Sequence, residues 1–234
     1  METNSFLHTA LYSLGFDCYL SAGRVWIAPD SRWTGWSHLV NLVTIAGSKY
    51  LCDVGFGSNE PVVPILLRHE EIASQIAPAS SKLVYQQLEQ YLSDSKVWVY
   101  MHRPDDNAEW TSLYCFTETE ILPSDIPGLN YSPWLSPHIH FTQKVVCVRQ
   151  TTDKEGDEPG LAKEETIDGG ELDGSLILDS DKFKWRRHGK TVLSRDLNSE
   201  EDRLEVLKRY FGMDLDVEDR QAIIGTVAAI PPKH

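Results

Sequence analysis

A histidine and an aspartate fifteen residues apart form the pair in this sequence best suited to chemistry. His38 ends the segment 34–38, TGWSH, and Asp53 begins the segment 53–57, DVGFG. A carboxylate can accept a hydrogen bond from one imidazole nitrogen, which fixes the tautomer and leaves the other nitrogen free to act as a base. His38 and Asp53 would then be the base and the orienting group beside a nucleophile. The spacing leaves one alternative open, a purely structural hydrogen-bonded pair.

Two strands are expected to position this pair. Apolar and polar residues alternate over 38–45 and 49–54, and the segment 46–48, AGS, between them is suited to a turn. We therefore expect an antiparallel hairpin in which His38 and Asp53 face each other near the open end.

The remaining elements indicate an α+β fold with a β-rich middle. Apolar residues at helical spacing over 6–14, followed by Gly15, predict a helix at the start. Ser199 with an acid three residues on predicts a last helix that ends before Gly212. Further strands are expected at 18–26, 83–91, 97–102, 112–117, 142–150, 175–178, 183–186 and 191–193.

None of the four cysteines is expected to be the nucleophile. Cys52 adjoins Asp53 and points to the opposite face of its strand, while Cys18, Cys115 and Cys147 lie in apolar strand contexts. Their wide spacing argues against a disulfide framework and against a zinc site. The sequence HIH at 138–140 has period-2 histidines without a third ligand, so no metal site is expected.

Charge and hydropathy exclude several classes of protein. The formal net charge of −13 argues against a protein that binds nucleic acid, and no apolar run is long enough to span a membrane. The first residues lack the basic start of a secretory signal, so a cytoplasmic protein is expected. Residues 153–173 carry nine acids against two bases, which predicts a solvated acidic loop.

Segments spread along nearly the whole chain resemble the arylamine N-acetyltransferase family, and most closely its fungal members. The resemblance rests on residues 4–6 (NSF), 14–17 (LGFD), 23–25 (GRV), 34–40 (TGWSHLV), 50–57 (YLCDVGFG), 114–120 (YCFTETE), 134–137 (WLSP), 141–142 (FT) and 195–211.

The resemblance implies an enzyme of xenobiotic metabolism that moves an acetyl or related acyl group from acyl-coenzyme A to an aromatic amine, hydrazine or hydroxylamine. In such a ping-pong mechanism, His38 and Asp53 match the histidine and aspartate of a Cys-His-Asp triad. Thr34 and Gly35 match a segment that approaches coenzyme A, and Phe56 and Phe141 match positions that line the substrate pocket. Acetyl-coenzyme A or another acyl-coenzyme A would be a co-substrate, with no tightly bound cofactor.

The resemblance also implies a domain order. Residues 1–16 would be a remnant of a helical first domain, most of which is missing, 17–140 a β-barrel domain, and 141–234 a C-terminal α/β lid with the acidic loop 153–173. The expected cysteine closes an Arg-Gly-Gly-x-Cys motif that would fall just before Met1.

Three interpretations follow from that missing cysteine. The favoured one is an N-terminally truncated copy of an acyltransferase, and the 234-residue chain itself is then expected to be inactive. The second is a catalytically dead acyl-coenzyme A binder or regulatory remnant, and the third is a Cys-His-Asp amide hydrolase or transglutaminase-like enzyme. Acyl transfer by the chain alone would make Cys18 and Cys52 the first substitute nucleophiles to test.

Overall fold

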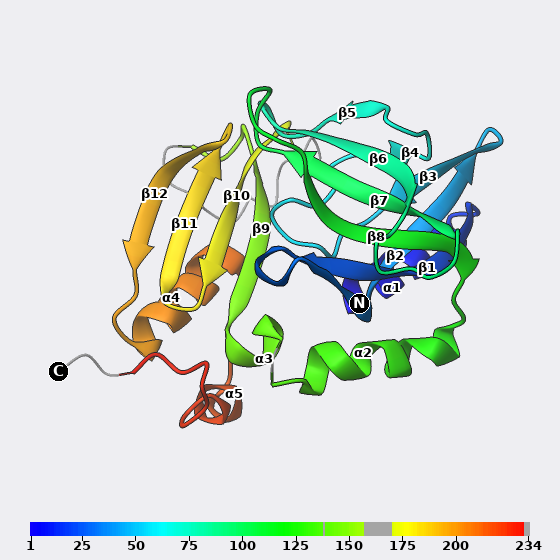
Figure 1. Ribbon diagram of the computed structural model, residues 1–234. Coiled ribbons are helices and arrows are strands. Elements are labelled where there is room, and N and C mark those ends of the chain that lie inside the picture. The colour runs from blue at the N-terminus through cyan, green and yellow to red at the C-terminus, as the bar shows by residue number, and fades with distance from the viewer. Residues whose placement is uncertain (138, 157–169, 232–234) are drawn as a thin grey trace. The chain divides into compact units, whose positions relative to one another are not determined.

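The computed structural model describes residues 1–137, 139–156 and 170–231, and it divides the chain into two compact units. The first unit covers Met1–Trp134 and the second covers Leu135–His234. Each unit contains one antiparallel sheet and helices, which confirms the α+β class (Figure 1). No helix in the described part of the chain is both long and apolar enough to cross a membrane.

The first unit is built around a strongly curved, barrel-like sheet with the strand order β4-β3-β2-β1-β8-β7-β6-β5 (Figure 1). The strands are β1 (Asp17–Ile27), β2 (Arg32–Ile45), β3 (Ser48–Cys52), β4 (Ile65–Leu66), β5 (Ile72–Ser74), β6 (Ser80–Gln87), β7 (Lys96–Arg103) and β8 (Thr111–Glu120). The predicted hairpin is present as β2 and β3. Its turn has positive φ at Ala46 and Gly47, as a tight two-residue connection requires.

One face of this sheet forms the main core of the first unit. The buried residues lie two apart along their strands, so their side chains point to the same face. They are Val40 and Leu42 on β2, Leu51 on β3, Ile65 on β4, Leu83 on β6, Trp98 and Tyr100 on β7, and Tyr114 and Phe116 on β8. Because aromatic residues fill much of this core, the end of the hairpin meets an aromatic surface.

Helix α1 (Glu2–Ser13) packs against β1 and β2 and ends at Leu14, before Gly15 with φ +86°. This confirms the predicted first helix and its glycine stop. The expected apolar face is wrong in detail, because Phe6 and Leu14 are 77% and 75% exposed while the only fully buried side chain of the helix belongs to Asn4. The helix is therefore held to the sheet by a polar contact rather than by a continuous apolar stripe.

Several predicted strand limits need correction. Strand β2 begins at Arg32, six residues earlier than expected, so the segment TGW lies within the strand. Strand β6 ends at Gln87 because a turn closed by Tyr91 N–H and Leu88 C=O follows it. Two 3-10 turns, Ala28–Asp30 and Pro123–Asp125, and helix α2 (Ile126–Leu135) complete the elements around this sheet.

The second unit has a four-stranded antiparallel sheet in the order β12-β11-β10-β9. Its elements are α3 (His140–Gln143), β9 (Val146–Thr152), β10 (Leu172–Asp179), β11 (Lys182–Arg187), β12 (Lys190–Asp196), α4 (Glu200–Phe211) and α5 (Val217–Ala222). Helix α4 begins as predicted, because the Asp202 N–H donates to the Ser199 side chain, and it ends at Gly212. The predicted strand 142–150 starts later, at Val146, because residues 140–143 are helical.

The acidic segment is not a solvated loop throughout. Glu155 and Asp173 are buried, and each forms an ion pair, with Arg149 and Arg187 respectively. Residues 157–169 of this segment lie outside the described part of the chain. Its two ends therefore belong to the packed second unit, which corrects the prediction made from charge alone.

Candidate functional site

The site begins where the β2–β3 ladder stops. Asn41 and Cys52 are the last paired residues, and Asp53 follows directly, so that its carboxylate reaches across to His38. His38 Nε2 lies 2.7 Å from Asp53 Oδ2, and the two residues are only 5% and 2% exposed. The hairpin thus brings together the two residues that the spacing placed opposite each other.

Asp53 is held as a carboxylate by donors on both of its oxygens. His38 contacts Oδ2. The other oxygen, Oδ1, accepts hydrogen bonds from Asn4 Nδ2 at 2.8 Å and from the Gly55 N–H at 2.9 Å. Burial alone would raise the pKa of Asp53, but the charge and hydrogen bond of His38 and the donors from Asn4 and Gly55 together lower this pKa. The buried carboxylate therefore stays ionised and fixes the orientation of the imidazole.

Asn4 is a site residue that the sequence did not reveal. Its side chain is fully buried, and Nδ2 donates to the Leu39 carbonyl at 2.7 Å as well as to Asp53. Its Oδ1 accepts from the Val54 N–H at 3.1 Å, and the Asn41 amide donates to the Asn4 carbonyl at 3.0 Å. The available signal was the helical spacing of Asn4 from Leu7 and Leu11, which puts the asparagine on their face of the helix. A buried amide there needs several hydrogen-bond partners.

Aromatic rings cover the other side of the imidazole. The His38 ring centroid lies 5.4 Å from that of Phe56 in an edge-on arrangement and 4.8 Å from that of Tyr114. Phe56 and Tyr114 are themselves 4.9 Å apart, and Tyr100 stacks on Tyr114. Phe56 was predicted from the family resemblance, whereas the two tyrosines were not predicted. Burial raises the pKa of Tyr114 well above the usual tyrosine value, so its hydroxyl remains protonated beside Asp53.

Two glycines allow the close approach of backbone and side chains at this site. A Cβ on Gly23 would lie 2.8 Å from the Cys115 carbonyl oxygen and 3.5 Å from the Cβ of His38. A Cβ on Gly55 would lie 2.7 Å from Asn4 Nδ2. Any larger residue at either position would displace the strand under His38 or the amide that holds Asp53.

Thr34 and Gly35 lie on β2, a few residues before His38. The Val25 N–H on β1 donates to Thr34 Oγ1 at 2.9 Å, and the Ser37 hydroxyl is 2.7 Å from the same oxygen. A Cβ on Gly35 would meet no atom within 4 Å, so the backbone there is open to a ligand. This is the structural basis for considering the segment as a coenzyme site.

One further predicted site residue belongs to the second unit. Phe141 is on α3 in the second unit, where it is 60% exposed. His138 lies outside the described residues. Within the described ranges, no three His, Cys, Asp or Glu side chains gather in a way that could hold a metal ion.

The four cysteines are poorly suited to nucleophilic attack. Desolvation raises the pKa of Cys52 to about 11 and that of Cys115 to about 12, and it also raises the pKa of Cys18 and Cys147. Cys18 Sγ lies 3.7 Å from the imidazole of His8, which is separate from the His38 site. Since only the thiolate is a strong nucleophile, none of these thiols is activated near neutral pH.

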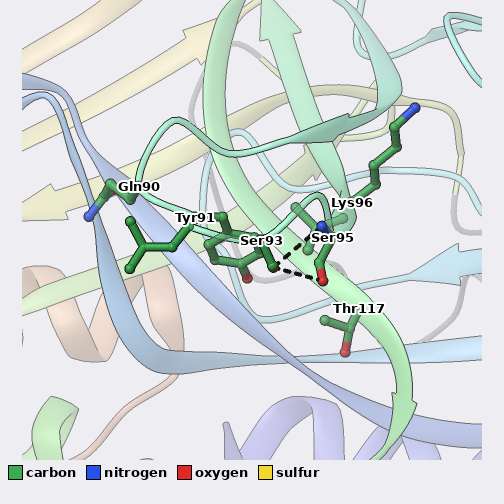
Figure 2. Close-up of a pocket in the computed structure, with 8 residues that line it drawn as sticks. Gln90, Tyr91, Ser93, Ser95, Lys96 and Thr117 are labelled. Atoms are coloured by element: carbon green, nitrogen blue, oxygen red, sulfur yellow. Dashed lines mark hydrogen bonds between the residues drawn. The ribbon is translucent and has the colours of Figure 1, made fainter.

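A separate open pocket of about 480 Å³ lies where the segment before β7 passes β8 (Figure 2). Gln90, Tyr91, Ser93, Lys96 and Thr117 are among its lining residues, and Ser93 contacts Ser95 within it. The lining contains neither His38 nor any other histidine, cysteine or carboxylate. It therefore offers hydrogen-bonding groups but no base and no activated nucleophile.

Comparison with known proteins relates the chain to one family. Residues 1–156 match the N-acetyltransferase family. The chain is 31% identical over 242 residues to an N-malonyltransferase of Fusarium pseudograminearum, an alignment that covers 95% of this chain and 67% of the relative. It is 28% identical over 162 residues to human arylamine N-acetyltransferase 1, covering 65% of this chain and 56% of that protein. The chain thus spans about two thirds or less of the length of these relatives.

Solved structures share the fold over nearly the whole chain. The arylamine N-acetyltransferase of Mycobacterium abscessus superposes with a TM-score of 0.73 at 23% identity, over 93% of this chain and 68% of that protein. The enzyme of Mycobacterium marinum in complex with coenzyme A gives a TM-score of 0.73 at 21% identity, over 96% and 74% of the two chains.

Proposed function

The chain belongs to the arylamine N-acetyltransferase family, and from this premise we propose that it carries the base, the orienting group and the substrate surface of an acyl-coenzyme A-dependent N-acyltransferase. The observation that carries the proposal is the buried His38–Asp53 hydrogen bond, with Asn4 on the second carboxylate oxygen. A histidine fixed in this way through Nε2 presents Nδ1 to a reacting group.

The proposed reaction has two halves. In the first, a cysteine thiolate paired with the His38 imidazolium attacks the thioester carbonyl, the carbon–sulfur bond to coenzyme A breaks, and coenzyme A leaves as a thiol with the proton from His38. In the second, the amine nitrogen attacks the acyl-cysteine, an amide forms, and the cysteine sulfur leaves. The proton lost by the amine returns to the His38–thiolate pair. Asp53 stabilises the imidazolium in both halves because it remains a carboxylate.

The aromatic surface around His38 supports an aromatic amine or hydrazine as the acceptor. The partly buried ring of Phe56 lies edge-on to the imidazole, and it is backed by the buried ring of Tyr114, so Phe56 is the ring that another aromatic ring could contact there. We propose Thr34 and Gly35 as the segment that approaches coenzyme A. The relative from Fusarium acts as an N-malonyltransferase, so malonyl as well as acetyl donors belong in the first assay.

The nucleophile of this proposal is not one of the four cysteines of the chain, because desolvation raises the pKa of each of them. We propose that it is a cysteine placed directly before Met1, at the start of α1 and so close to Asn4 and the site. A thiol at a helix N-terminus and beside an imidazolium has the environment that lowers a cysteine pKa. The 234-residue chain by itself is then expected to bind an acyl-coenzyme A without transferring its acyl group.

The test compares the chain as given with a version in which a five-residue Arg-Gly-Gly-x-Cys segment is joined to Met1. Both are incubated with acetyl- or malonyl-coenzyme A, and release of free coenzyme A and acylation of the protein are measured with and without an arylamine. The extended chain should gain one acyl group on the added cysteine, and His38→Ala should abolish this. Acylation of the unextended chain on Cys18 or Cys52 would overturn the assignment, and thioester hydrolysis without an amine would favour a hydrolase.

A further inference from the structure

Arg24 is a partly buried arginine that no carboxylate among the described residues accompanies. Its guanidinium carbon lies 3.9 Å from the centre of the Trp36 ring, and its NH1 donates to the Thr34 carbonyl at 3.0 Å. The Nε atom is shielded from solvent and has no hydrogen-bond acceptor in the described structure. Among the described residues, a ring and one carbonyl hold the side chain in place, and no carboxylate pairs with its charge.

This lack of a partner is unusual in the chain. Acids outnumber bases by 35 to 22, and most arginines in the described ranges form ion pairs with carboxylates. Such arginines are Arg32, Arg68, Arg103, Arg149, Arg187, Arg195, Arg203 and Arg220. A partly buried charge without a counter-ion is costly, whereas an anionic ligand at that position would offset the cost.

The position of Arg24 in the sheet limits which part of a ligand it can contact. Arg24 pairs with Cys115 on β8, while its neighbours Gly23 and Val25 pair with Phe116 and Tyr114. Adjacent residues of a strand point to opposite faces, so Arg24 lies on the face away from Tyr114 and the His38 ring. An anionic group bound there cannot be attached directly to the acyl carbon that reacts beside His38.

The backbone next to Arg24 is open to a ligand. Gly35 follows Thr34, whose carbonyl holds the guanidinium, and a Cβ on Gly35 would meet no atom within 4 Å. Coenzyme A thioesters carry their phosphates at the far end of a long pantetheine arm, well separated from the acyl group. A planar guanidinium with free N–H donors is suited to bind phosphate oxygens in pairs.

Building on the proposed function, we propose that Arg24, stacked on Trp36 beside Gly35, anchors a phosphate group of the acyl-coenzyme A donor. In this role Arg24 is a binding residue for the donor and takes no part in the proton transfers at His38. It would contribute equally to donors with different acyl groups, because the phosphates are common to all of them.

Isothermal titration of coenzyme A into the 234-residue chain and its variants tests the proposal. Arg24→Met should weaken coenzyme A binding about tenfold or more, as expected for the loss of a charge-assisted contact. Arg24→Lys, which keeps the charge but not the paired donors, should lie between Arg24→Met and the unchanged chain. The control is Arg68→Met, which removes the same charge from an arginine paired with Glu71 on an exposed surface and should bind as the unchanged chain does.

The outcomes separate this inference from the proposed function. If the unchanged chain does not bind coenzyme A, both fail. If the unchanged chain and both Arg24 variants bind equally well, only the role of Arg24 fails. Acetyl- and malonyl-coenzyme A should lose the same factor in Arg24→Met, and a loss confined to malonyl-coenzyme A would show that Arg24 contacts the acyl carboxylate instead. Circular dichroism establishes that each variant is folded, and Arg24→Lys decides the question if Arg24→Met unfolds.

Discussion

Asn4 and His38 hold the two oxygens of one carboxylate, since Asn4 Nδ2 donates to Asp53 Oδ1 at 2.8 Å while His38 Nε2 lies 2.7 Å from Oδ2. The first helix is thereby connected to the end of the hairpin through the residue that orients the imidazole. Because the same asparagine also bonds the Leu39 carbonyl and the Val54 N–H, it fixes the backbone on both sides of the site. We therefore treat Asn4 as a positioning residue for Asp53.

Replacing Asn4 by alanine should destabilise the first unit. The change removes one donor from the buried Leu39 carbonyl and one from the buried Asp53 carboxylate, and it also removes the acceptor of the part-buried Val54 N–H. Each unsatisfied buried group costs about 1–3 kcal/mol, so a loss of about 2 kcal/mol or more in the free energy of unfolding is expected in urea titrations. Asn130→Ala is the matched control because its amide donates to Glu2 at the surface. Equal effects of the two changes would refute the role given to Asn4.

Acid should weaken the fold in part through Asp53. Its pKa is lowered in the folded chain, so the folded state binds a proton less readily than the unfolded state does. The resulting stability is present above the unfolded value of about 3.9 and is lost as the pH falls through the lower folded pKa. The stability difference between the unchanged chain and Asp53→Asn, measured by unfolding from pH 7 to pH 2.5, should therefore shrink at the acid end. A difference that stays constant over this range would contradict the lowered pKa.

The thiols should react slowly with alkylating reagents in the folded chain. The pKa values of Cys52 and Cys115 are raised to about 11 and about 12 by desolvation, so the thiolate fraction at pH 8 is very small. Peptide mapping after iodoacetamide treatment should find Cys115 unmodified under native conditions and all four cysteines modified in the unfolded chain. Rapid alkylation of Cys18 or Cys52 at pH 7 would reveal an activated thiol, and that cysteine would then be a candidate nucleophile.

The pairing of His38 with Asp53 could be predicted because it depends on local rules. The alternation of apolar and polar residues predicted the two strands, and the segment 46–48 predicted the turn between them. Antiparallel pairing of the strands then determined which residues face each other. The last helix was equally accessible through Ser199 and Gly212, since capping residues act on their own helix. The fold of the whole chain was predicted from the family resemblance, and a solved structure shares this fold over 93% of the chain.

The contacts that complete the site depend on residues far apart in sequence, and no local rule predicts them. Asn4 and Asp53 are 49 residues apart, and Tyr114 reaches His38 only because β8 pairs with β1. The prediction of a solvated loop over 153–173 was wrong at its ends for a similar reason, because a charge count cannot show that Glu155 and Asp173 have arginine partners. Strands β4 and β5 were missed because they contain only two and three residues.

The second unit offers a test that does not depend on the active site. Asp173 is buried, accepts a hydrogen bond from Thr151 Oγ1 at 2.9 Å, and pairs with Arg187, whose Nε donates to it at 2.7 Å. Asp173→Leu removes the charged acceptor of Arg187, whose side chain is 24% exposed, and of the Thr151 hydroxyl, and the loss of such charge-assisted hydrogen bonds costs about 1.5–3 kcal/mol.

The matched control for this change is Asp196→Leu, whose pair with Lys182 is exposed on the same sheet and should matter by about 1 kcal/mol or less. Chemical unfolding followed by the fluorescence of the tryptophans should show the large loss for Asp173 alone. If the two changes had equal effects, the ends of the acidic segment would be surface features, as charge alone had suggested, and the Asp173–Arg187 pair would not contribute to the packing of this unit.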